Sequence, residues 1–218
     1  MTALRHLASV LALALLPAPA AASDDSFEFW INPSASFALD GDTGLELETA
    51  QRFRRASDGR PDTYFARLWL NQDLGNAATL SGAVERRIND GEDDETRLHQ
   101  QLSTRHGILR TRLRLEQRFV DDRDRVGLRL RPRLGAAAPI GRDGRWSAFG
   151  DAELFLTLRS TGRGGDDGLT GLRTRIGATY ELNNRVSLSA AYLRQQSIVE
   201  GGPDELGHAP LLGIEFSF

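Results

Sequence analysis

The chain has 218 residues, of which 26% are charged, and a formal net charge of −3. Its 27 lysine and arginine residues are all arginine, and it has no cysteine, which excludes a disulfide framework. Beyond the N-terminus no segment reaches the run of about 18 apolar residues that a membrane-spanning helix needs, which excludes a helical membrane protein.

Residues 1–22 have the features of a secretory signal peptide. Arg5 and His6 precede the apolar residues 7–16, and the segment ends in three alanines, a small-residue cleavage pattern. An ordinary buried first helix is the alternative, but the alanine- and proline-rich tail would end such a helix poorly. We therefore expect cleavage after the alanines, which leaves one mature domain of residues 23–218.

Eleven segments with the alternating polarity of β-strands follow in chain order, separated by clusters of turn-forming residues. They cover residues 27–39, 45–53, 63–74, 78–88, 96–106, 108–119, 125–134, 146–158, 169–182, 186–199 and 210–218. These lengths are close to what a tilted membrane strand needs. Short connections such as Gly75-Asn76 and Asn183-Asn184 alternate with longer polar ones such as residues 162–168, as in outer-membrane barrels.

Arginines occupy alternate positions on the sixth and seventh segments. Arg112 and Arg114 are interleaved with leucines on one segment, and Arg129 and Arg131 on the next. A period of two places the arginines on one face of a strand and the aliphatic side chains on the other, as in the wall of a transmembrane β-barrel.

The sequence therefore predicts an all-β fold, a single transmembrane antiparallel up-and-down β-barrel in the outer membrane of a Gram-negative bacterium. Bacterial single-chain barrels have even numbers of strands, so eleven segments imply either a missed strand or a first segment that is not a full wall strand. Twelve strands are favoured over ten.

The same parity predicts which charged side chains face the lumen. They are Arg110, Arg112, Arg114, Glu116, Arg118, Arg129, Arg131, Arg133, Glu153, Arg173 and Arg175. An excess of positive charge in a polar lumen would attract anions, which favours a narrow channel for small anionic or polar solutes. Alternatively, these groups pair with carboxylates and fill a structural barrel without transport, because a buried unpaired charge is costly. Twelve strands would favour the pore and ten the filled barrel.

The C-terminal strand is amphipathic and ends on an aromatic residue. Leu212, Ile214, Phe216 and Phe218 alternate with polar or small residues. This ending resembles the signal by which outer-membrane proteins are recognised by the barrel-assembly machinery, so that machinery is an expected partner. A soluble sheet that happens to end in phenylalanine is the alternative.

Several motifs together resemble the uncharacterised outer-membrane barrels called domain of unknown function 2490. They are Trp30, residues 48–53, Arg97-Leu98, the run 112–119, Arg129-Leu130-Arg131, Glu153, residues 173–177 and Phe218. The resemblance covers nearly the whole mature chain and implies a barrel that is located in the outer membrane. It implies no substrate and no catalytic residue.

Candidate residues for enzymatic chemistry are few. His99 and Ser103 share a strand face but lie about 13 Å apart at strand rise, too far for contact. His106 and His208 have outward parity and could face the lipid boundary, where some outer-membrane acyl hydrolases act. With no nucleophile motif, we expect no enzyme and no catalytic residue, and a lipid-acting enzyme is the less favoured alternative.

Acidic clusters fall in the predicted loops, at residues 90–95, 121–124, 166–167 and 204–205. Oxygen ligands of this kind suit hard divalent cations that bridge to lipopolysaccharide phosphates, but solvated loops are the favoured interpretation because no cluster has EF-hand spacing. We expect no metal site, no cofactor and no nucleic-acid partner, and we expect contact with outer-membrane lipids and lipopolysaccharide.

Overall fold

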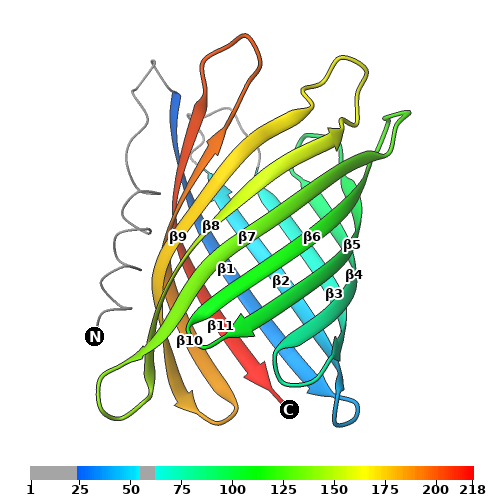
Figure 1. Ribbon diagram of the computed structural model, residues 1–218. Coiled ribbons are helices and arrows are strands. Elements are labelled where there is room, and N and C mark those ends of the chain that lie inside the picture. The colour runs from blue at the N-terminus through cyan, green and yellow to red at the C-terminus, as the bar shows by residue number, and fades with distance from the viewer. Residues whose placement is uncertain (1–23, 55–61) are drawn as a thin grey trace.

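The computed structural model describes residues 24–54 and 62–218, which form a closed barrel of eleven strands (Figure 1). The strands are β1 (Asp24–Ala38), β2 (Thr43–Arg54), β3 (Thr63–Asp73), β4 (Ala78–Asn89), β5 (Glu95–His106), β6 (Leu109–Val120), β7 (Gly127–Ile140), β8 (Trp146–Arg159), β9 (Gly168–Asn183), β10 (Val186–Ser197) and β11 (Glu205–Ser217). In these ranges no helix has the length and hydropathy to cross a membrane. The expected signal peptide lies outside the described residues.

The barrel closes through a parallel pair. Each strand from β1 to β11 pairs antiparallel with the next, and β11 then pairs parallel with β1, from Asp24↔Glu205 to Ser36↔Ser217. Because each hairpin reverses the chain, the first and last of an odd number of strands run in the same direction and can only pair in parallel.

The expectation of twelve or ten strands is therefore wrong for the described chain, and so is that of a wholly antiparallel wall. The eleven periodic segments of the sequence are the eleven strands of the barrel. The even number is a regularity of bacterial barrels and is not a requirement for satisfying the backbone at closure, since a parallel pair also forms a continuous ladder.

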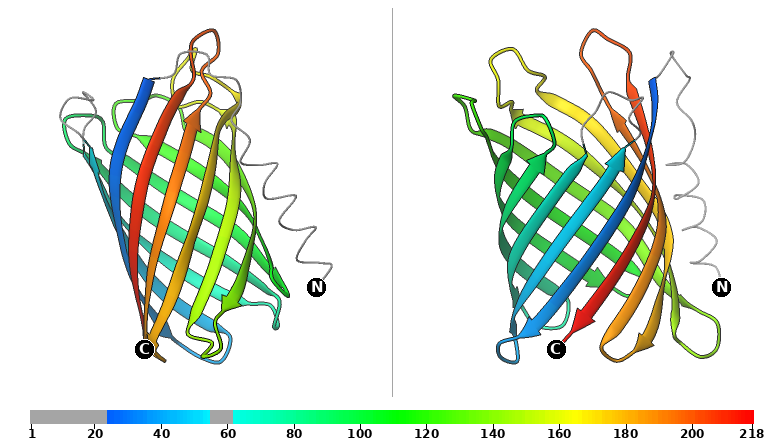
Figure 2. Two further views of the ribbon diagram at one scale, coloured as in Figure 1. Left: turned by 90° about the vertical axis from the view of Figure 1, so that its left-hand side faces the viewer. Right: turned by 180° about the vertical axis from the view of Figure 1, so that it is seen from behind.

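The strands are strongly staggered around the wall. Following cross-strand partners once around the barrel from Ala38 leads to Asp24 on the same strand, 14 residues away. Such a stagger tilts strands by roughly 40° from the barrel axis. Figure 2 shows the strands running obliquely around the barrel in both views. Eleven strands enclose more space than the eight that side chains just fill, so the interior needs long side chains or retains a cavity.

The two ends of the barrel differ in their connections. Short turns at residues 39–42, 74–77, 107–108, 141–145 and 184–185 lie with the C-terminus at one end, called the turn end. The described loops at the other end, the loop end, cover residues 90–94, 121–126, 160–167 and 198–204. Gly107 allows a two-residue turn because its φ of 57° is favourable for glycine.

Two strands are longer than their sequence pattern indicates. β7 continues to Ile140 through small residues that lack alternation, and β11 begins at Glu205, five residues before the start that the sequence predicts. In β7 the backbone still pairs with β8, and a Cβ on Gly135 would lie 2.6 Å from the Cβ of Asp151. Glycine is therefore required for this close approach of the two strands. The extension of β7 has no signal in the alternation of residue types.

The outer face of the barrel is apolar and the inner face is charged. On β3 the outward Leu68 is 48% exposed, whereas the neighbouring inward Arg67 is 6% exposed. Aromatic pairs sit near both ends of the outer face. At the turn end Phe37 stacks on Phe218 at 5.1 Å, and Trp146 lies 4.7 Å from Tyr180. At the loop end Phe53 and Tyr64 make an edge contact at 6.4 Å between ring centroids.

Candidate functional site

A cavity of about 660 Å³ lies inside the barrel, and eight of the eleven predicted lumen residues line it. These are Arg112, Arg114, Arg129, Arg131, Arg133, Glu153, Arg173 and Arg175. The predicted inward face of β6–β9 is thus the face that borders the cavity.

The other three predicted residues share the inward parity but have different surroundings. Glu116 is completely buried behind the arginines. Arg118 pairs with Glu95 towards the loop end, with 2.6 Å between Nε and Oε1. Arg110 donates to the Gly107 carbonyl at the turn end, 2.5 Å away.

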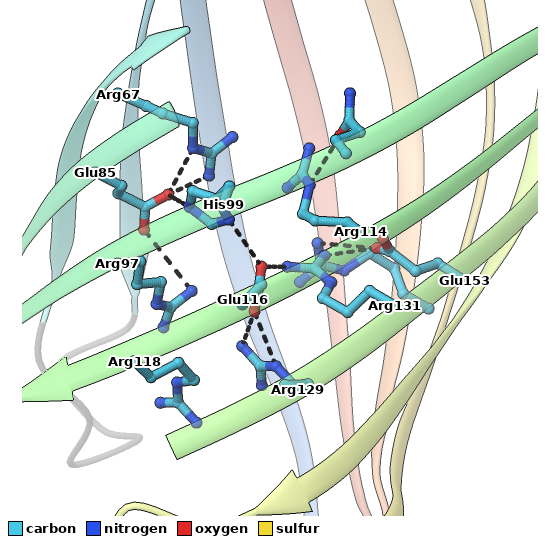
Figure 3. Close-up of polar contacts among 12 residues, drawn as sticks. Arg67, Glu85, Arg97, His99, Arg114, Glu116, Arg118, Arg129, Arg131 and Glu153 are labelled. Atoms are coloured by element: carbon cyan, nitrogen blue, oxygen red, sulfur yellow. Dashed lines mark hydrogen bonds and ion pairs between the residues drawn. The ribbon is translucent and has the colours of Figure 1, made fainter. Parts of the chain in front are cut away.

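Glu116 is the centre of one group of ion pairs (Figure 3). Its Oε2 accepts hydrogen bonds from Nε and Nη2 of Arg129, at 2.9 and 2.8 Å, and its Oε1 accepts one from Arg131 at 2.5 Å. Arg131 also donates to Glu153 at 2.6 Å, and Arg112 pairs with the other oxygen of Glu153. Ionised donors and acceptors of this kind make strong hydrogen bonds, which offset the cost of burying the charges.

Glu85 is the centre of a second group, on β3–β5. This carboxylate is completely buried, pairs with Arg67, and accepts a hydrogen bond from Arg87 at 2.9 Å. Arg97 lies 3.7 Å from it. The predicted lumen residues do not include these three arginines, although their alternation with apolar side chains on residues 63–74, 78–88 and 96–106 could have identified them.

His99 lies between the two groups. Its Nε2 is 3.4 Å from Glu85, its Nδ1 is 3.6 Å from Glu116, and its ring lies 5.6 Å from Trp69. Figure 3 shows the imidazole between the two carboxylates. Ser103, considered with it as a catalytic pair, instead accepts a hydrogen bond from Gln101 at 3.2 Å. His99 therefore lies between the two carboxylate centres of the charged network, and neither of its ring nitrogens makes a hydrogen bond within the described residues.

The walls of the cavity differ in character. Its lining contains eleven arginines but four glutamates, which are Glu46, Glu48, Glu153 and Glu215. The arginines come from β2–β9, which we call the charged side. The lining from β10, β11 and β1, the neutral side, consists of serine, leucine, glutamine, asparagine, glycine, isoleucine and tryptophan apart from Glu215.

Three of the lining arginines have no carboxylate within ion-pair distance in the described part of the chain: Arg52, Arg114 and Arg133. The guanidinium of Arg52 lies 3.9 Å from the Trp30 ring centre, and that of Arg114 lies 4.9 Å from Trp69. Attraction between a cation and an aromatic ring stabilises both without neutralising their charge.

Two lining glutamates are in the opposite situation. Glu46 and Glu215 have no arginine within ion-pair distance in the described ranges, and both lie near the turn end of their strands. The unpaired positive charge therefore lies in the middle and loop-end parts of the cavity, while the unpaired negative charge lies at the turn end.

The outward histidines are far apart on the wall. His208 lies near the loop-end start of β11, where its Nδ1 is 2.7 Å from the Tyr192 hydroxyl oxygen. His106 is the last residue of β5, exposed at the turn end. They do not form one site.

The acidic loops make local ion pairs. Arg86 bonds both Asp94, at 3.0 Å, and Asp121, at 2.9 Å. The hydrogen bond from Arg86 lowers the pKa of the Asp121 carboxyl below its usual value. Among the residues that the structure describes, no group of three or more histidine or acidic side chains is placed to hold a metal ion.

Comparisons with known proteins identify a family and a related chain, and the description of neither states a function. A family model described as "Protein of unknown function (DUF2490)" matches residues 27–205, from β1 to the first residue of β11. An uncharacterized protein of Methylorubrum extorquens is 33% identical over 105 residues, which cover 48% of this chain and 46% of that protein. The chain thus spans about half the length of this curated relative.

Proposed function

The chain belongs to the DUF2490 family, and we propose that it is an outer-membrane barrel that admits small anions to its interior and passes them across the membrane. The family description names no activity, so the proposal depends on the chemistry of the two faces of the wall.

The outer face supports the membrane location. Large apolar side chains such as Leu68, Leu113 and Ile176 are about half exposed along the wall. Soluble proteins rarely expose an apolar surface of this extent, whereas hydrocarbon tails cover it well. The aromatic pairs near the two ends, Phe53–Tyr64 and Trp146–Tyr180, match the belts of aromatic residues found at membrane–water interfaces.

The observation that carries the anion preference is the charge of the cavity lining, eleven arginines against four glutamates. Four further carboxylates behind the lining, Glu85, Glu95, Glu116 and Asp151, neutralise part of this charge. The eleven arginines still outnumber these eight carboxylates by three, and Arg52, Arg114 and Arg133 are the lining arginines without an ion pair in the described ranges. A confined positive potential raises the local concentration of anions and repels cations.

A filled, structural barrel is the second candidate, and the ion-pair network favours it. Glu85, Glu116 and Glu153 tie together strands β3–β9 and occupy much of the charged side. Cross-strand ion pairs also help to fix strand register. In this case the cavity would hold water or a ligand but would not conduct.

Planar-bilayer recordings distinguish the two candidates. In a potassium chloride gradient we expect single-channel steps and a reversal potential that indicates chloride selectivity. Replacing Arg114 and Arg133 together by glutamine should lower that selectivity, whereas Arg163→Gln, in the exposed loop 160–167, should leave it unchanged. No steps from correctly folded protein would support the filled barrel, and cation selectivity would refute the anion pathway.

The membrane location has its own test. The protein should fractionate with outer membranes, and unboiled protein should migrate differently from boiled protein in a detergent gel. Recovery in the soluble periplasmic fraction would contradict it.

A further inference from the structure

An apolar strip lies on the neutral side of the barrel interior. Trp30, Leu193, Ala209 and Leu211 face inward from β1, β10 and β11, are all buried, and form one hydrophobic cluster. The lumen-facing side of a water-filled barrel is normally polar, so inward leucines need an explanation other than lipid contact.

Two guanidinium groups border this strip. Arg52 lies 3.9 Å and Arg173 lies 5.1 Å from the Trp30 ring centre. Arg173 also donates to the Gln195 amide oxygen at 3.1 Å from its Nε and lies 5.0 Å from Phe155. Two positive charges therefore converge on one indole ring.

Arg52 retains unused hydrogen-bonding capacity. Its buried Nε has no hydrogen-bond partner within the described residues. Glu28, on the same side of the barrel, is already engaged, because it pairs with Arg54 at 2.7 Å and accepts the Trp30 indole N–H at 2.6 Å. These bonds also hold the indole ring in place. Arg52 also lines the main cavity and has no carboxylate within ion-pair distance in the described ranges, so an anion in the cavity would supply the counter-charge that its guanidinium lacks.

These residues form a neck between two cavities. Trp30, Arg52, Leu193, Gln195 and Ser197 line both the main cavity and a smaller one of about 60 Å³. The smaller cavity includes Ser26 and Gly207, near the loop-end starts of β1 and β11. A solute that moves between the loop end and the main cavity along the neutral side meets this neck.

We infer that the neck recognises small organic anions, in which a carboxylate adjoins a short apolar or aromatic body. The carboxylate would bind the guanidinium groups of Arg52 and Arg173, whose planar forks suit two-point hydrogen bonding to carboxylates. The body would lie against Trp30, Leu193 and Leu211. This inference builds on the proposed anion pathway and specifies its solute class.

Other solutes fit the neck less well. An inorganic anion such as chloride or phosphate would lose part of its hydration beside the leucines, and it has no apolar group whose burial would offset that cost. A neutral sugar would leave the Arg52 guanidinium without a counter-charge. Because two guanidinium groups lie beside an apolar strip, the neck favours a solute that carries both a carboxylate and an apolar group.

Binding of benzoate to the purified barrel in detergent tests the inference directly. Isothermal titration should show saturable binding of benzoate at least ten-fold tighter than binding of inorganic phosphate. Arg52→Gln should weaken benzoate binding at least ten-fold. Leu193→Ser should weaken benzoate binding but leave phosphate binding unchanged. Arg163→Gln, in an exposed loop, is the charge-matched control, and gel migration of unboiled samples confirms that each variant has folded.

The outcomes separate this inference from the proposed transport. Equal affinity for benzoate and phosphate, no saturable benzoate binding, or unaltered binding by folded Arg52→Gln and Arg173→Gln variants would each overturn it. Chloride currents without benzoate block would retain the anion channel and refute the neck site. Tight benzoate binding without any current would retain the neck site and refute the channel.

Discussion

The charged side of the interior, β2–β9, carries arginines and glutamates that are largely joined by ion pairs, whereas the neutral side, β10, β11 and β1, carries mostly uncharged side chains, several of them apolar. Both sides belong to the same closed sheet with the same outer face. On the charged side, stability depends on mutual compensation of buried charges. In the proposed channel, solutes move along the neutral side, where the serines at positions 187, 189 and 197 occupy less space than the arginines opposite. The proposal thus assigns stability mainly to one wall and conduction to the other.

The largest expected effect of a single substitution is on the charged side. Glu116→Gln would leave Arg129 and Arg131 buried with less counter-charge, and should reduce the free energy of unfolding by about 3–5 kcal/mol. Glu215→Gln, at an exposed lining residue without an ion pair in the described ranges, should change it by only about 0.5 kcal/mol. Urea titrations of the folded barrel in lipid vesicles measure both. Equal effects would show that the network does not stabilise the wall.

A smaller loss of stability is expected where the neutral side meets the charged side. A Cβ on Gly177, in β9, would lie 2.7 Å from the Cβ of Ala191 and 2.8 Å from the Phe149 ring. Gly177→Ala should therefore cost about 1–3 kcal/mol through overpacking. Gly75→Ala is an unsuitable control because its φ is positive, but Gly82→Ala, with its closest contact at 3.9 Å, should be nearly neutral. The same urea titrations measure both variants. Equal losses of stability would show that close packing at Gly177 is not the cause.

Conduction should respond to the neutral side and not to the charged side. Ser189→Phe would place a ring in the main cavity and should reduce single-channel conductance by at least about half, because the pore diameter limits ion flow. Gln100→Phe, an exposed position on β5 that lines neither this cavity nor the one at the turn end, should have little effect. If both changes reduced conductance equally, the path would not follow β10, β11 and β1.

Much of the fold follows from the alternation of residue types. Arg67 beside Leu68, or Arg112 beside Leu113, assigns each strand an inner and an outer face because successive side chains point in opposite directions. The parallel closure of β1 on β11 has no local signal, since it depends only on the number of strands. The extension of β7 through residues 135–138 has none either, because small residues do not alternate.

The pairing of charges was less predictable than their placement. Glu116 and Arg129 are direct cross-strand partners and do pair. Arg133 is the direct partner of Glu153, yet Glu153 binds Arg112 and Arg131 instead. Long guanidinium side chains reach diagonally across the sheet, so register alone does not decide which arginine remains unpaired. The apolar strip was missed because inward Leu193 and outward Leu188 give β10 apolar residues on both faces.

The smallest expected effect concerns the acidic end of the cavity. Glu46 and Glu215 are the lining carboxylates without an arginine at ion-pair distance in the described chain, and both lie near the turn end. Their negative charge opposes the entry of anions from that end and attracts counter-cations. Replacing both by glutamine should therefore raise the chloride-to-potassium permeability ratio, by roughly two-fold for a change in local potential of this size.

Reversal potentials in a potassium chloride gradient measure this ratio, and replacing Asp166 and Asp167, in the loop at the opposite end, controls for the change in net charge. A lower ratio would mean that the two glutamates do not face the ion path. The change should also be larger at low salt, because a screened surface charge loses its influence within about 10 Å at 0.1 M ionic strength.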